Sequence, residues 1–505
     1  MEFETSKETF NINQIIASKS QSSVIESDCI VPDIKPDLLQ VVQTSGIVNV
    51  YKKELSDGKM RIDGSVLAYV MYIGSDGKKK QIKSICHNMD FSQIIVLGNV
   101  KSEMNENTSV SLNQINCKII NERKVSIKAE LGFNVQVFTS SSIENINDVK
   151  IDDLQKLEKK FNINTIVGIG STKANISEKI NCDSKIQDIL SVTANVNSID
   201  SKISVNKVLE KANFDIKIMY LSNDNKINIV KRTFPIMGFI DMNNVKNENV
   251  CLPHFEINNL LVKPNGTEDL SISLDADINI SLIVYENKEI SISQDMYSPS
   301  KNLKFTRKLL STTGSLVSQA GTYNFQHREA LNIGENNVCN IEPRFANIHT
   351  SISGNIVTIV ADANFDILST DKSGILSLNK ITVPINYKLS ISNQEAISAN
   401  SSISVNYNII NENFNITPAN ELDLRMDVNF ILSINSNVSL NIVNSVSEES
   451  APQIPPYNIV IYYTKGNETL WEIAKKYKST PANIMKMSNL KSNQLTPGMQ
   501  LFITR

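Results

Sequence analysis

Cysteine, histidine and tryptophan are scarce in this sequence, and none of them is grouped as a metal site or a disulfide framework requires. The 505 residues include six cysteines, four histidines and one tryptophan. The cysteines stand singly, without a C-x-x-C pair, which predicts free thiols in a reducing cytosol and neither disulfides nor zinc. The six are Cys29, Cys86, Cys117, Cys182, Cys251 and Cys339.

Catalytic motifs are missing as well. No histidine has a partner in His-x-x-x-His or Glu-x-x-His spacing, which argues against a metal site. The four are His87, His254, His327 and His349. No P-loop, Gly-x-Ser-x-Gly or dinucleotide-binding glycine motif occurs in a strand–turn–helix context. We therefore predict that the protein is not an enzyme and uses no cofactor, and an enzyme with a targeting module is the third of three interpretations.

Long apolar runs and a basic excess are absent too. No run approaches the roughly 20 apolar residues that a membrane-spanning helix needs. The start, MEFETSKETF, lacks the basic and apolar regions of a secretory signal. The net charge of −3 gives no basic excess for binding nucleic acid. These absences predict an intracellular protein with no membrane span and no nucleic-acid partner.

What the sequence does contain is a repeat. The segment FNIN at 10–13 returns at 161–164, and ANFDI at 212–216 returns at 363–367, each 151 residues later. The segment at 70–78 matches 218–226, and alternating strand pairs begin near 124, 269 and 421. A period this long indicates a duplicated domain, because solenoid repeats are shorter. We infer three copies of one unit.

Each copy has a period of two, with apolar and polar residues alternating as in a half-buried strand. Turn signals separate these runs, at Asp57-Gly58, Asp76-Gly77, Asn265-Gly266 and Ser373-Gly374. We predict a mostly β protein of three tandem antiparallel sandwich-like or barrel-like repeats. Short helical turns are expected at 37–42 and 188–192. Our domain boundaries are 1–140, 161–297 and 298–444 for the repeats, 141–160 for a polar connector with helical tendency, 445–456 for an exposed linker, and 457–505 for a terminal module.

The terminal module has the pattern strand, helix, helix, strand. Thr469 stands three residues before Glu472, as in the capping box that begins a helix. Pro481 suits the first turn of a second helix, where its missing N–H is not needed. Pro497-Gly498 then turns the chain into a closing strand. We predict a small βααβ fold with a modest core.

This module resembles the LysM family over its whole length, through YYTKGNETLWEIAKKY, the Ser-Asn-Leu corner and LTPGMQLFI. The family usually has Gly-Asp where this chain has Asn467-Glu468. The resemblance implies a binding groove between the first turn and the loop after the second helix. The residues it places there are Lys465, Gly466, Asn467, Glu468, Thr469, Trp471, Met487, Ser488, Asn489 and Leu490. Trp471 has two interpretations, as a core residue or as a binding anchor, and Asn489 is equally explained as the left-handed end of a helix.

The first repeat resembles the SPOCS domain through DCIVPDIKPDLLQVV at 28–42, IDGSV at 62–66 and Phe91-Ser92. SPOCS repeats followed by LysM are typical of spore coat morphogenetic proteins. The resemblance implies a scaffold in the mother-cell cytoplasm, at the forespore surface, that binds the basal-layer ATPase SpoIVA through LysM. The Asn- and Ser-rich strands could recruit other coat proteins edge to edge, or simply reflect composition. The alternative is a LysM protein that binds peptidoglycan or a chitin-type glycan, against which the altered turn and the missing export signal argue.

Overall fold

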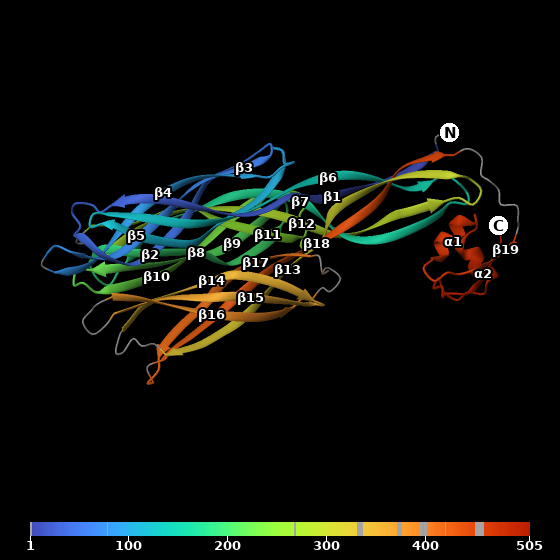
Figure 1. Cartoon of the computed structure of the whole chain (residues 1–505). Coiled ribbons are helices and arrows are strands. Elements are labelled where there is room, and N and C mark those ends of the chain that lie inside the picture. The colour runs from blue at the N-terminus through green and yellow to red at the C-terminus, as the bar shows by residue number, and fades with distance from the viewer. Residues whose placement is uncertain are drawn as a thin grey trace.

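The structure is a computed structural model that describes residues 3–504, apart from 78, 267–268, 331–336, 371–375, 393–396, 398–400, 420 and 450–458. It confirms the predicted class, because three β repeats of six strands each precede a small module (Figure 1). The first repeat contains β1 (Thr5–Ile30), β2 (Asp37–Ser56), β3 (Lys59–Ser75), β4 (Lys80–Val96), β5 (Asn105–Asn121) and β6 (Lys124–Val149).

The other two repeats have the same order of strands. The second contains β7 (Gln155–Asn181), β8 (Ile186–Ser204), β9 (Lys207–Ser222), β10 (Ile227–Asp241), β11 (Val250–Pro264) and β12 (Ser271–Tyr297). The third contains β13 (Leu303–Ala330), β14 (Asn337–Ser353), β15 (Ile356–Thr370), β16 (Leu376–Ser390), β17 (Ser402–Ile416) and β18 (Glu421–Glu448).

Every repeat is a sandwich of two antiparallel sheets. The second, third and fourth strands form a meander, as in β2-β3-β4. The long last strand pairs with the long first strand on one side and with the fifth on the other, as in β1-β6-β5. A single pairing of Ile163 with Gly314 joins the latter sheets of repeats two and three into one sheet, β11-β12-β7-β13-β18-β17. The alternating apolar residues meet between the two sheets, so each repeat has a core of its own.

The three sandwiches, which we call the heads, also pack against one another. The middle strand of each meander is buried on both faces, and its outer side chains Met71, Met219 and Leu368 share one apolar cluster. This shared contact explains why the segments at 70–78 and 218–226 are alike. Between the first two heads, Lys35 forms a largely buried ion pair with Asp188 at 2.9 Å. The repeats are thus bundled, not strung out one after another.

The long strands extend beyond the heads and form a narrow stalk, seen on the right of Figure 1. At one level of the stalk three cross-strand pairs meet in a common core, Phe10–Ile143, Phe161–Ile290 and Leu310–Leu440. Each repeat contributes one pair, so the stalk exists only when all three repeats are present. A second cluster around Ile146, Met296 and Val443 fills its far end.

Buried polar groups mark the junction between the stalk and the heads. The Asn13 amide donates to Oδ1 of Asn164 at 3.2 Å, and the Thr313 hydroxyl donates to the same oxygen at 2.6 Å. These three residues hold equivalent positions in the three repeats. Asn13 and Asn164 are the last residues of the two FNIN segments. The repeated asparagine therefore ties the repeats together through hydrogen bonds that are shielded from water.

Three expectations about local structure are wrong. Residues 37–42 and 188–192 are the starts of β2 and β8, not helical turns. Each start carries two closely spaced bulges, at Leu38/Gln40 and Val41/Gln43 in β2, which break the period of two and imitate helical spacing. The connector expected at 141–160 is mostly strand, because β6 runs to Val149 and β7 begins at Gln155.

The remaining boundaries differ less. The turn signals at 57–58, 76–77 and 265–266 do separate strands, whereas 373–374 lies outside the described residues. The expected linker begins in strand, since β18 runs to Glu448, and residues 450–456 of it are also outside the described part. The module contains β19 (Ile459–Tyr463), α1 (Leu470–Lys476), α2 (Pro481–Met487) and β20 (Gln500–Thr504). No helix in the described part of the chain is long and apolar enough to cross a membrane.

Candidate functional site

The terminal module folds for the local reasons that its sequence indicates. The Thr469 hydroxyl accepts from the Glu472 backbone N–H at 3.2 Å, and the Glu472 carboxylate accepts from the Thr469 N–H at 2.9 Å, which completes a capping box. Thr480 caps α2 through its hydroxyl alone, which accepts from the Asn483 N–H at 3.1 Å, and Pro481 is the first residue of that helix. β19 and β20 pair antiparallel and cover the apolar sides of both helices. The predicted βααβ fold is confirmed.

The turn at 465–469 is closed by its own carboxylate. Glu468 accepts from the Lys465 backbone N–H at 3.0 Å and from the Tyr462 hydroxyl at 2.5 Å. The hydrogen bond from Tyr462 lowers the pKa of Glu468, and the same bond raises the pKa of Tyr462 to about 12. Gly466 has φ of +98° and packs so closely on Pro497 that a side chain there would collide. The departure from Gly-Asp thus leaves a well-ordered turn.

The loop at 487–490 lies beside β20. The Ser488 hydroxyl accepts from the Phe502 N–H at 2.8 Å, which fixes the end of α2 to β20. Asn489 has φ of +51°, so it is the left-handed residue that ends the helix. Met487 is 45% exposed, whereas Leu490 packs on the module core.

Trp471 lies in neither of these segments. Its indole N–H donates to Oδ2 of Asp295 at 2.8 Å, and its ring meets the Tyr297 ring edge to face, with centroids 4.9 Å apart. Both partners belong to β12, at the tip of the stalk. The sequence left two interpretations for Trp471, a core residue or a binding anchor. The structure shows a different arrangement, in which Trp471 joins the module to the stalk.

Asp295 is the electrostatic centre of this joint. Lys475 of α1 places its Nζ 2.7 and 2.8 Å from the two carboxylate oxygens, and Arg307 of β13 pairs with the same group. Burial alone would raise the pKa of Asp295, but the hydrogen bonds from Lys475 and Trp471 outweigh it and hold that pKa below its usual range. Three donors around one carboxylate make it a satisfied, partly buried anion.

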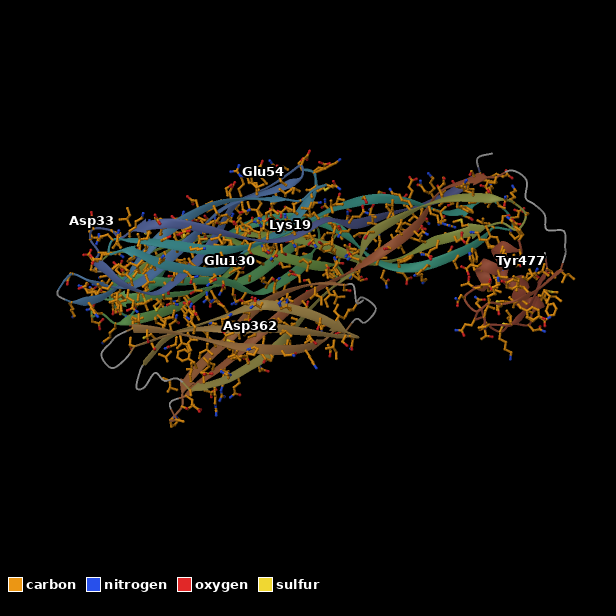
Figure 2. All side chains as sticks on the ribbon, in the orientation of Figure 1. Lys19, Asp33, Glu54, Glu130, Asp362 and Tyr477 are labelled. Carbon is orange, nitrogen blue, oxygen red and sulfur yellow. The ribbon has the colours of Figure 1, made fainter. Side chains whose placement is uncertain are left out.

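Further contacts complete the joint. The Tyr297 hydroxyl donates to the Ser479 carbonyl at 2.8 Å, and burial, with the neighbouring charge of Asp295, raises the pKa of this phenol. Lys478 donates to the Lys301 carbonyl and to the Asn302 side chain. Figure 2 shows where this puts the module, with Tyr477 labelled at one end of the molecule and Asp33, Glu54 and Asp362 on the heads.

The ten residues predicted for the groove lie on three parts of the module, the 465–469 turn, α1 and the 487–490 loop. Lys465, Gly466, Asn467 and Thr469 are exposed beside the Pro497-Gly498 turn. The 487–490 loop is held to β20 through Ser488, and Trp471 faces the stalk. Sequence reasoning missed Asp295 and Tyr297 as neighbours of Trp471, because they lie about 175 residues earlier in the chain and no local motif marks them.

The three heads also meet around a space of their own. A cavity of about 580 Å³ lies between them and is lined by residues of all three repeats, including Val48, Ala194 and Tyr407. His254 and Glu256 border it, and Glu256 pairs with Lys53 at 2.9 Å, an ordinary buried ion pair. Among the described residues, no group of three or more His, Cys, Asp or Glu side chains could hold a metal ion.

Comparison with protein families gives two matches. The family described as "SipL, SPOCS domain" matches residues 37–120 and 185–265, and the LysM domain family matches 462–504. The first two segments cover β2–β5 and β8–β11, that is, a meander and the edge strand after it, and β14–β17 repeat that arrangement. No curated protein and no solved structure matches the chain. In its domains and their order the chain is SipL-like, with SPOCS and LysM as non-catalytic binding modules.

Proposed function

We propose that this protein is a scaffold for spore coat assembly that binds the basal-layer ATPase SpoIVA through its LysM module. SPOCS and LysM domains in one chain support a sporulation-related binding protein without catalysis. The proposal places it in the mother-cell cytoplasm at the forespore surface. The single observation that carries it is the order of domains, SPOCS repeats first and one LysM module last.

The charge of the module favours a protein partner of opposite sign. Residues 457–505 contain seven basic and two acidic residues, a net charge of +5, while the whole chain carries −3, which leaves −8 on residues 1–456. Lys465, Lys476, Lys486 and Lys491 are exposed on the module. An acidic protein surface would meet complementary potential here. We propose Lys465, Asn467, Met487 and Asn489 as contacts and omit Trp471, whose indole is occupied by the stalk.

The test is a binding measurement with the full chain. SpoIVA should bind the wild type and should lose binding when residues 457–505 are deleted. Lys465→Glu and Met487→Ala should each weaken binding by roughly 1–3 kcal/mol if they are central anchors. Leu309→Ala, a change at a 73% exposed stalk residue, is the control that should bind normally. Circular dichroism and melting curves must first show each variant folded.

Binding of glycan is the competing function, and the same proteins decide it. If the chain held N-acetylglucosamine oligomers through the module and ignored SpoIVA, the scaffold proposal would be wrong. The turn argues against this outcome, since Glu468 already uses the Lys465 N–H and the Tyr462 hydroxyl, which are polar groups that a sugar would otherwise need.

The repeats supply a second surface, for other coat proteins. Of the edge strands among the described parts of the three repeats, β17 is the one without Lys, Arg or Pro, the residues that usually block edge pairing. It exposes Ile410 at 56%, Phe414 at 38% and Ile416 at 47%, with one bulge beside Ile410. We propose that it accepts an extended strand of another coat protein. Phe414→Lys should abolish that capture without unfolding the head, and unchanged capture would exclude this edge.

A further inference from the structure

We propose that the tip of the stalk is a docking seat for the LysM module, so that the module is a fixed part of the molecule. The seat comprises Asp295, Tyr297, Lys301 and Asn302. Asp295 of the seat and Trp471 of the module are the residues that position the module on the stalk. This inference goes beyond the proposed function and does not depend on the identity of the partner.

Comparison of the three repeats is the strongest argument. Their last long strands carry a bulge at the same level, at Asn147, Gln294 and Asn444. The residues that follow each bulge are equivalent, and they read Asp-Val-Lys at 148–150, Asp-Met-Tyr at 295–297 and Ser-Val-Ser at 445–447. The middle residue of each triplet turns into the stalk core. The outer positions hold Asp295 and Tyr297 in the second repeat, Asp148 and Lys150 in the first, and two serines in the third.

Only the second triplet is built to hold a neighbour. Asp148 forms an exposed ion pair with Lys156, and Lys150 and Ser447 are exposed. Tyr297, in contrast, is only 4% exposed because the module covers it. An aromatic side chain at the open end of a stalk would otherwise face water. The repeats thus share a fold, and the second one alone combines a carboxylate with an aromatic ring at this level, where the pair contacts Trp471 and Lys475.

The connection makes docking within one chain the favoured arrangement. Residues 449–458 separate β18 from β19, and ten residues span at most about 35 Å when extended. A module held that close to its seat is present at an effective concentration of roughly millimolar or more. Even a modest interface is then occupied most of the time.

The lone tryptophan lets the seat be tested without a label. Trp471 is the single tryptophan of the chain, so all indole fluorescence reports the joint. In the wild type its anisotropy should decay with the rotation of the whole 56.2 kDa chain, and acrylamide should quench it weakly. The double variant Asp295→Ser/Tyr297→Ser gives the second repeat the outer residues that the third repeat tolerates. It should show an added fast decay and at least about twofold stronger quenching.

Controls and outcomes are matched to this design. Asp148→Ser changes the equivalent aspartate of the first repeat and should behave as wild type. If the double variant lowers the melting temperature, Asp295→Asn replaces it in the test, because this change removes only the charge of the side chain. A fast, module-sized decay in the wild type, or a double variant identical to it, would overturn the seat. A joint that forms only as protein concentration rises would also overturn it, because the module would then dock on a second copy.

Discussion

At the scale of single residues, the chemistry of the joint depends on one carboxylate. Asp295 accepts from an indole, an ammonium and a guanidinium that come from α1 and β13. Trp471 could be recognised from the sequence as important, but its partner could not, because contact between residues 295 and 471 is created by tertiary packing. Aligning the three triplets 148–150, 295–297 and 445–447 marks Tyr297 as the outlier, whereas Asp295 has a counterpart in Asp148.

The pH dependence of the joint follows from the lowered pKa of Asp295. An acid with a lower pKa in the docked state stabilises that state above its free pKa, about 3.9, and loses this contribution as the pH falls through the lower, docked pKa. We therefore expect the emission and anisotropy of Trp471 to stay constant from pH 7 to about pH 4 and to change below it. In Asp295→Asn this acid transition should disappear. A transition near pH 6 would point to another group.

Cys117 and Cys251 should behave as poorly reactive thiols. Burial, with the charge of Cys29 nearby, raises the pKa of Cys117 to about 12, and burial raises the pKa of Cys251 to about 11, with a smaller effect of Glu210. Since the thiolate is the reactive form, both should react slowly with a disulfide reagent at pH 8 in the native protein. Denaturation should release six thiols, as the six cysteines are free. Fewer than six, with a faster-running band on non-reducing gels, would reveal a disulfide.

At the scale of elements, the sequence predicts strands well where alternation is unbroken and poorly where bulges interrupt it. The first halves of β12 and β18 keep the alternation and match the expected strands, whereas the starts of β2 and β8 carry two bulges each and resemble helical turns. The full length of the stalk strands was also missed. The outer half of each stalk strand is polar on one side, as in 141–149. Its narrow apolar side packs against the other repeats, so the sequence of a single repeat gives no reason to expect a strand there.

The shared stalk core predicts cooperative unfolding. Ile292 is fully buried beside Phe10, Ile163 and Leu440, so residues of all three repeats surround it. Ile292→Ala should lower the free energy of unfolding by about 2–4 kcal/mol through lost burial and a cavity. Urea unfolding should remain one transition, observed alike by circular dichroism and Trp471 fluorescence.

Leu309→Ala is the matched control in the same stalk. Because Leu309 is 73% exposed, its loss should change stability by no more than about 0.5 kcal/mol. Three separate unfolding transitions, with Ile292→Ala shifting only the second repeat, would show that the repeats fold independently and that the stalk core contributes little.

At the scale of the whole molecule, the module and the rest of the chain carry net charges of opposite sign. The module carries +5 and the remainder −8. If an acidic partner is steered to the module, its association rate should fall as salt rises, because charges are screened over about 8 Å at physiological ionic strength. Lys465→Gln and Lys491→Gln should reduce that salt dependence in stopped-flow or surface binding measurements. Association that is indifferent to salt would contradict electrostatic steering.

The length of the long strands determines the distance between the heads and the module. β12 and β18 have 27 and 28 residues, and a strand of that length spans at most about 90 Å. With the heads at one end and the module held at the other, the gap between the heads and the module is set by how many residues the strands contain. Two residues added to each of the six stalk strands would widen that gap by about 7 Å and keep every apolar side chain facing inward. One residue added to each strand would turn the inward side chains out to water. The stalk can therefore change length only in steps of two residues per strand.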